Sequence, residues 1–195
     1  MQWNASQICL ALLRVLSEKI ANMKITLASL ATSFALILSA YSAEVNTKIS
    51  DVHLCCQSCV KGVQAAVGKV SGATASVNKD EGTVELTGPD AATVQKAADA
   101  LVAAGYFGKS SDSNIKISTS TGAKGKQVQS LKLEGVHLCC GKCVTAVDKA
   151  VRSVSGVKDH TAVKNAESFE VTGDFNDKEV FAAVQKSGLT GKAGK

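Results

Sequence analysis

The stretch HLCCQSCV at residues 53–60 returns at residues 137–144 as HLCCGKCV. These two copies hold six of the seven cysteines in the 195-residue chain. Thiolates are soft ligands that select Cu(I), Zn(II) and related ions, and a Cys-x-x-Cys spacing lets one small ion bridge two sulfurs. The duplication therefore predicts soft-metal binding at both copies.

The repeat extends well beyond the cysteines. Three further motifs recur in the same order: VSG at 70–72 and 154–156, VELTG at 84–88 against FEVTG at 169–173, and GYFGK at 105–109 against GLTGK at 188–192. Two copies of one module, with small differences in loop length, explain this pattern.

The first copy has a readable order of elements. Residues 47–54 alternate as a strand does, and Cys59, Val63, Val67 and Val70 keep a helical spacing that Gly72 is expected to end. Two short alternating strands follow at 73–77 and 83–87, then a helix to about residue 104 with Asp90 as its N-cap, and a last strand after Gly105.

The second copy follows the same plan, with a strand in 128–138, a helix ended by Gly156, and Asn176 or Asp177 opening its last helix. The order βαββαβ predicts an α+β protein: two tandem ferredoxin-like domains after an N-terminal signal segment. We place the domains at 46–109 and 128–193. Residues 110–127, rich in Ser, Thr, Gly and Lys, are predicted to form a flexible linker.

Residues 1–43 have the plan of a secretory signal. Lys24 precedes an apolar stretch at 25–38, and small residues follow, so cleavage is expected after Ser42 or Ala43. Met23 reads as the true start, which makes 1–22 a mis-annotated extension. The alternative is an uncleaved membrane anchor. Export would place the protein in the periplasm or outside the cell, with no membrane span after cleavage.

Charge and composition narrow the functional classes. The formal net charge is +5, with scattered lysines, so we expect no nucleic-acid partner. The sequence carries no phosphate-binding loop, no bundle of membrane spans and no catalytic triad, and we therefore expect neither a pump nor an enzyme.

The motif and its context resemble the heavy-metal-associated (HMA) domain family, whose pattern is roughly Gly-Met-x-Cys-x-x-Cys. The resemblance covers both predicted domains. It implies metal binding by four cysteines at the family positions: Cys56, Cys59, Cys140 and Cys143. It places Leu54 and Leu138 where the family has a buried Met under the loop. It also implies that Tyr106 lies beside the metal loop of the first copy.

The spacing has a physical rationale. One cysteine sits in the loop and the next in the first helical turn, where unpaired N–H groups and the helix dipole stabilise thiolates. Lys142, inside the second Cys-x-x-Cys, adds a positive charge there or meets an acidic partner. Two thiolates suit linear Cu(I) or Hg(II), whereas Zn(II) and Cd(II) need further ligands. We favour Cu(I).

Cys55 and Cys139 depart from the family pattern. Adjacent residues of an extended chain point to opposite sides, so either cysteine joins its neighbours only if the loop bends. They are candidates for third ligands, for a link between copies or molecules, or for neutral variation. His53 and His137 are weaker ligand candidates, since two residues separate each from the Cys-x-x-Cys, and a surface ring is the plainer interpretation.

Three functional hypotheses follow. The first is an exported metal chaperone, scavenger or buffer, with metal ions and a metal-transport or metal-accepting protein as partners. The second is a thiol–disulfide redox protein using the Cys-x-x-Cys pairs, although a single proline, Pro89, cannot supply a cis-proline to each. The third is an envelope interaction module held by disulfides.

Overall fold

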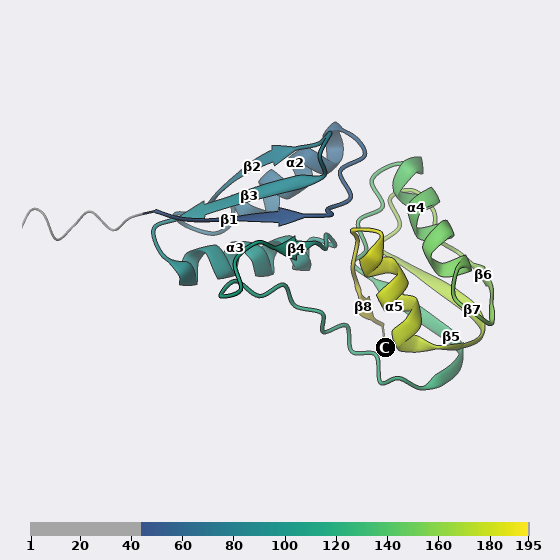
Figure 1. Ribbon diagram of the computed structural model, residues 1–195. Helices are drawn as coiled ribbons and strands as arrows, with labels where there is room; N and C mark the ends of the chain where they lie inside the picture. Colours follow the sequence, from purple (N-terminus) through teal and green to yellow (C-terminus); the bar gives the residue numbers. More distant parts are fainter. Residues whose placement is uncertain (1–43, 195) are drawn as a thin grey trace, which may run out of the picture. The chain divides into compact units, whose positions relative to one another are not determined.

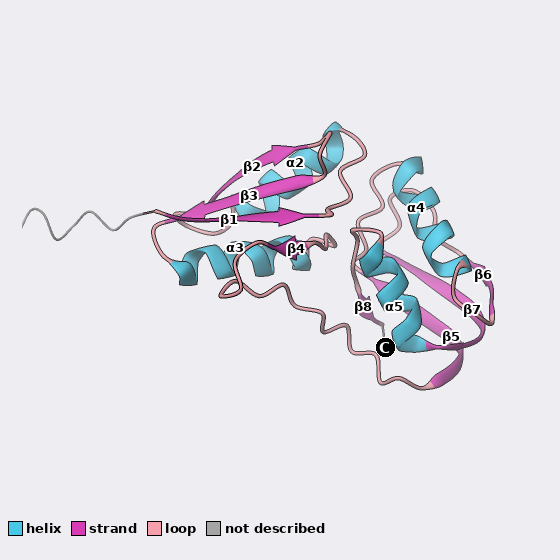
Figure 2. Cartoon of the chain, viewed as in Figure 1, coloured by secondary structure: helices cyan, strands magenta, loops and turns pink. Residues whose placement is uncertain are grey.

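The computed structural model describes residues 44–194 (Figures 1 and 2). The expected signal segment, the start at Met23 and the cleavage position lie outside these residues. Within them, no helix combines the length and apolar character needed to cross a bilayer.

The first half contains one four-stranded antiparallel sheet and two helices. Its elements are β1 (Val45–Ser50), α2 (Gln57–Val67), β2 (Thr74–Asn78), β3 (Thr83–Gly88), α3 (Ala91–Ala103) and β4 (Lys109–Ser110). The strands lie in the order β2-β3-β1-β4. Ile49 of β1 pairs with Val84 of β3 and with Ser110 of β4, which fixes the register.

The second half repeats this arrangement. Its elements are β5 (Gln127–Glu134), α4 (Gly141–Arg152), β6 (Val157–His160), β7 (Ser168–Asn176), α5 (Asp177–Lys186) and β8 (Lys192–Ala193). The strand order is β6-β7-β5-β8, with all neighbours antiparallel. The α+β class and the two ferredoxin-like βαββαβ domains predicted from the sequence are confirmed.

One-sided burial explains why each sheet carries its helices on a single face. Along β1, Thr47 and Ile49 are buried while Asn46 and Lys48 are exposed. The apolar stripes of α2 and α3 pack against this buried face and against each other. The same alternation in β5 and β7 receives α4 and α5.

Two predicted N-caps are confirmed, and several predicted ends are wrong. The Asp90 carboxylate accepts a hydrogen bond from Thr93 N–H at 2.7 Å, and Asn176 accepts one from Lys178 N–H at 3.0 Å. The predicted strand 47–54 ends at Ser50, because Asp51 takes a left-handed conformation (φ 62°) that turns the chain out of the sheet.

The first predicted helix also ends early. Helix α2 stops at Val67 instead of continuing to Gly72, and α4 stops at Arg152 instead of reaching Gly156. Val70 N–H bonds to Val67 and Ala73 N–H bonds to Val70 across successive tight turns. Gly72 and Gly156, at φ 80° and 85°, therefore belong to the turns that enter the next strand.

The predicted linker is fixed to the rest of the fold at several points. Between β4 and β5 the described chain forms neither helix nor strand, but Ile115 is buried. The Gln95 side chain bonds both to the N–H and to the carbonyl oxygen of Lys116. The Asp177 carboxylate accepts hydrogen bonds from the N–H groups of residues 124–126 at 2.7–3.0 Å.

Candidate metal centre

The two cysteine loops are built alike. Cys56 is the N-cap of α2 and Cys140 the N-cap of α4, so Cys59 and Cys143 lie within the first turn of each helix. Leu54 and Leu138 are buried beneath the loops, 5% and 4% exposed. The sulfur of each N-cap cysteine lies 3.7 Å from the sulfur of the second cysteine of its own loop, Cys56 from Cys59 and Cys140 from Cys143.

All six sulfurs of the two loops come together. Cys59 and Cys143 are fully buried and the other four are half-buried, and none of the six is in a disulfide bond. Nine pairs of Sγ atoms lie 3.3–3.9 Å apart, five of them joining one loop to the other. The sequence predicts a separate site at each loop. The structure instead brings the six sulfurs into one group, which we call the six-thiol cluster.

The cluster has an approximate twofold symmetry that follows from the repeat. The distance from Cys55 Sγ to Cys143 Sγ is 3.5 Å, and the symmetry-related distance from Cys139 Sγ to Cys59 Sγ is also 3.5 Å. The pair on the symmetry axis, Cys59 and Cys143, is 3.9 Å apart. Each domain therefore contributes an equal half of the cluster.

Cys55 and Cys139 both belong to the six-thiol cluster. In an extended chain they would point away from the cysteines that follow them. The loop bends, so that Cys55 Sγ lies 3.7 Å from Cys59 Sγ of its own loop and 3.3 Å from Cys140 Sγ of the other. Cys139 Sγ lies 3.7 Å from Cys56 Sγ in the same way. The additional cysteine of each loop thus connects the two copies.

The crowded sulfurs shift one another's pKa values. The pKa of Cys59 is lowered well below its usual range, chiefly by a hydrogen bond from the Cys143 thiol and also by His137, while burial opposes this. The pKa of Cys143 is raised, chiefly because its proton serves that hydrogen bond. Burial, the largest effect on Cys55, raises its pKa to about 12. The cluster therefore holds thiolates and thiols side by side, and a soft cation can replace the shared protons.

Helix N-termini favour the charged form at the cluster. The first turns of α2 and α4 read Gln-Ser-Cys and Gly-Lys-Cys, without an acidic residue. At Cys140 the effect of burial is outweighed by hydrogen bonds from the backbone N–H groups of Cys143 and Lys142 and by the Cys55 thiol, and the pKa falls to about 6. The Lys142 side chain itself is exposed.

Tyr106 lies against the cluster, and its hydroxyl joins the two domains. It donates a hydrogen bond to the carbonyl oxygen of Cys59 at 2.9 Å and lies 2.9 Å from His137 Nε2. A phenol has one proton and a carbonyl only accepts, so His137 donates from Nε2. The His137 ring also stacks on Tyr106, with ring centroids 4.5 Å apart.

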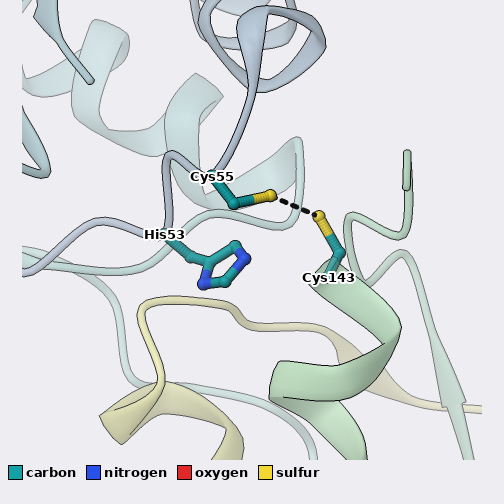
Figure 3. A group of neighbouring side chains, drawn as sticks. All are labelled: His53, Cys55 and Cys143. Atoms are coloured by element: carbon teal, nitrogen blue, oxygen red, sulfur yellow. Dashed lines mark hydrogen bonds between the residues drawn. The ribbon is translucent and has the colours of Figure 1, made fainter. Parts of the chain in front are cut away.

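His53, the counterpart of His137, has no such partner. Leu189 stands where the other copy has Tyr106, and the two residues form a β-bridge. Among the described residues, His53 Nε2 is the one buried side-chain nitrogen or oxygen without a hydrogen-bond partner. Its ring lies beside Cys55 and Cys143, with a ring nitrogen within 4.8 Å of both sulfurs (Figure 3). Burial lowers the pKa of His53, which keeps the imidazole neutral and able to ligate a metal.

Two glycines let the domains approach closely enough to share the cluster. A Cβ on Gly188 would lie 2.5 Å from His53 N and 2.5 Å from Asp51 O, and a Cβ on Gly105 would lie 2.5 Å from His137 N. The Gly188 carbonyl accepts from His53 N–H at 3.2 Å, and the Gly105 carbonyl accepts from Thr190 N–H at 2.9 Å. Sequence reasoning missed this role, although both glycines recur at matching positions of the repeat.

Comparisons with known proteins identify no family. No protein-family model matches the chain, and no curated protein matches it. Among solved structures, it is similar to the N-terminal domain of PacS from Synechocystis PCC6803 (20% identity, 35% of this chain and 100% of that one, TM-score 0.32).

Two further solved structures are similar to the chain. One is the apo HMA domain of the copper chaperone for superoxide dismutase (25% identity, 45% of this chain and 86% of that one, TM-score 0.32). The other is the pair of N-terminal soluble domains of Bacillus subtilis CopA (18% identity, 78% of this chain and 95% of that one, TM-score 0.27).

Proposed function

We propose that the chain is an exported, non-enzymatic protein that binds soft metal ions, Cu(I) above all, and serves as a chaperone, scavenger or buffer. The observation that supports this is the six-thiol cluster, whose sulfurs already lie 3.3–3.9 Å apart in nine pairs. A metal–sulfur bond of about 2.3 Å separates two ligands of one ion by roughly 3.8 Å in tetrahedral and 4.0 Å in trigonal geometry. Metal binding thus needs little rearrangement.

The donor set favours Cu(I) over the alternatives. Six thiolates form a soft ligand set, and groups of three sulfurs that lie within 4.8 Å of one another suit three-coordinate Cu(I). Hg(II), Zn(II) and Cd(II) remain candidates for the same sulfurs, with zinc needing four ligands for each ion. Four of the six sulfurs are half-buried, which leaves an acceptor or transport protein a route for exchanging metal.

The test is a titration of the purified chain, reduced and free of oxygen, with Cu(I) and separately with Zn(II). A chromophoric chelator competes for the metal, and native mass spectrometry counts the ions that stay bound. Retention of Cu(I), and a loss of bound copper in Cys56→Ser and Cys140→Ser, would support the proposal. If the chain keeps no metal while its mass falls by pairs of hydrogens in air, the proposal fails.

The redox hypothesis keeps one observation in its favour, the short distances between sulfurs of different loops. Oxidation of any such pair would release two protons and two electrons to an acceptor. Measuring the reduction potential and insulin reduction by the same preparation separates this function from metal binding.

Export is part of the proposal and has its own test. The protein is expressed from its complete gene, and the N-terminal residue of the mature form is sequenced. A mature form starting at Ala43 or Glu44 supports export, whereas one that retains residues 25–38 supports the membrane anchor.

A further inference from the structure

The six sulfurs of the cluster occupy the corners of an octahedron. Besides the nine pairs at 3.3–3.9 Å, three more pairs lie within 4.8 Å: Cys55–Cys56, Cys56–Cys140 and Cys139–Cys140. Every sulfur then has four neighbours and one opposite partner. The opposite pairs are Cys55 with Cys139, Cys56 with Cys143, and Cys59 with Cys140.

Alternate faces of this octahedron provide four triangles of sulfur. They are Cys55–Cys56–Cys140, Cys56–Cys59–Cys139, Cys139–Cys140–Cys143 and Cys55–Cys59–Cys143. Each sulfur belongs to two of the four triangles. An ion on each triangle would therefore have three thiolate ligands, and each thiolate would bridge two ions.

The distances between sulfurs within these triangles are close to those that a three-coordinate metal ion needs. The triangle Cys55–Cys59–Cys143 has edges of 3.7, 3.9 and 3.5 Å. The triangle Cys56–Cys59–Cys139 has edges of 3.7, 3.5 and 3.7 Å. Trigonal coordination at a metal–sulfur distance of about 2.3 Å needs edges of roughly 4.0 Å. A small expansion of the cluster would accommodate the ions.

We propose that the two loops bind four Cu(I) ions together as one thiolate-bridged cluster, in place of one ion at each Cys-x-x-Cys. This inference rests on the proposed soft-metal function and specifies its stoichiometry. It assigns Cys55 and Cys139 the same role as the four cysteines at the family positions. Each domain supplies three of the six sulfurs, so neither domain alone can form the cluster.

Charge balance is consistent with the surroundings. Four Cu(I) ions take the place of the protons that remain on the cluster's thiols, copper keeps its oxidation state, and six thiolates with four monovalent cations leave two negative charges. The N-termini of α2 and α4 each present about half a positive charge to the cluster. Their first turns, Gln-Ser-Cys and Gly-Lys-Cys, place no carboxylate against it.

The test is an oxygen-free Cu(I) titration of the reduced chain, followed by native mass spectrometry and X-ray absorption spectroscopy. We expect the apo form to give way to a four-copper form with little one- to three-copper protein between them. Copper–copper scattering and three sulfurs for each copper should appear in the absorption spectrum.

Variants distinguish a shared cluster from two separate sites. Cys55→Ser and Cys56→Ser should abolish the four-copper form equally, since each removes a corner of two triangles. Ser58→Ala, at an exposed position in the first turn of α2 between Cys56 and Cys59, should retain it. Two coppers per chain, unaffected by Cys55→Ser, would overturn the cluster while leaving the soft-metal function intact. Failure to retain any copper would overturn both.

Discussion

Cys55 Sγ lies 3.3 Å from Cys140 Sγ, the shortest of the nine sulfur distances, although the residues belong to different domains. Two free thiols at this separation can form a disulfide after modest movement of their side chains. The same contact that assembles the metal site therefore exposes it to oxidation. A protein exported to an oxidising compartment would depend on bound metal to protect these thiols.

We therefore expect mild oxidation of the metal-free chain to produce disulfides between the two loops, with Cys55–Cys140 prominent. Loading with Cu(I) beforehand should suppress them, because the sulfurs are then engaged. Proteolysis without reduction, followed by mass spectrometry of the linked peptides, identifies the pairs. Disulfides confined to Cys56–Cys59 and Cys140–Cys143 would contradict the closeness of the loops.

Thiol reactivity should differ between Cys140 and Cys55. The pKa of Cys140 is lowered to about 6, and that of Cys55 is raised to about 12. A lowered pKa means that thiolate, the reactive form, is present above pH 6 and lost as the pH falls through that value. Pulse alkylation of the metal-free chain between pH 5 and pH 9 should label Cys140 with a midpoint of about 6.

Cys55 serves as the comparison in the same experiment. Both side chains are half-buried, so access alone does not separate them. Cys55 should stay largely unlabelled up to pH 9, because burial and its neighbours keep it protonated. Peptide mapping reports both sites at once, and labelling of the two cysteines with a common midpoint would count against the charge distribution described here.

The local pattern of the sequence predicts the fold well, because period-two and helical spacing depend on neighbouring residues. The Asp90 and Asn176 caps follow directly from such signals. The ends of β1 and α2 cannot be predicted from such signals. They depend on the left-handed conformation of Asp51 and on the turns after Val67, which the local residue pattern does not specify. Val70 continues the helical spacing of Val63 and Val67 in the sequence, but it lies in a turn after the end of α2.

The sequence identifies the residues of the candidate site, but it does not predict that the two copies meet to form a single site. The repeat identifies all six cysteines, but a sequence of two copies does not say whether the copies meet. Their meeting depends on the bare backbones of Gly105 and Gly188 and on the Tyr106 hydroxyl. The plainer interpretation of His53 as a surface ring also followed from sequence distance alone, and the fold instead buries its Nε2.

Gly188 offers a test of the domain contact. Alanine there would place Cβ 2.5 Å from the backbone of Asp51 and His53, so the loops must separate. Gly188→Ala should therefore prevent formation of the four-copper form and lower the free energy of unfolding. Native mass spectrometry and urea denaturation measure the two effects.

Gly122→Ala is the matched control for this change. Gly122 has φ 84°, close to the 80° of Gly188, so alanine at either position is forced to a positive φ, at a cost of roughly 1–2 kcal/mol. Around Gly122, however, the nearest atom to an added Cβ is Ala193 Cβ at 3.6 Å, an ordinary contact. Equal copper loading in the two variants would show that the approach of Gly188 to His53 does not control the cluster.

Zinc binding should depend on one of the two histidines. Zn(II) prefers four ligands, and Cys₃His is a common set. His53 lies within 4.8 Å of the Cys55 and Cys143 sulfurs, and Cys59 completes the triangle. His53→Ala should weaken Zn(II) binding by roughly tenfold or more, while the Cu(I) stoichiometry stays the same because that cluster uses sulfur alone.

His137→Ala is the control, since it removes the same ring from the symmetry-related position. Because His137 Nε2 is engaged by Tyr106, its loss should cost stability, by about 1–3 kcal/mol for the unpaired groups, more than zinc affinity. Zn(II) competition with a chromophoric chelator gives the affinities, and Co(II) substitution gives absorption bands that report nitrogen ligation. Bands that survive His53→Ala, or equal losses of zinc affinity in the two variants, would remove His53 from the site. A loss of zinc affinity in His53→Ala alone would support His53 as a zinc ligand. The two copies would then differ because Leu189, at the position equivalent to Tyr106, leaves the His53 ring without a hydrogen-bond partner.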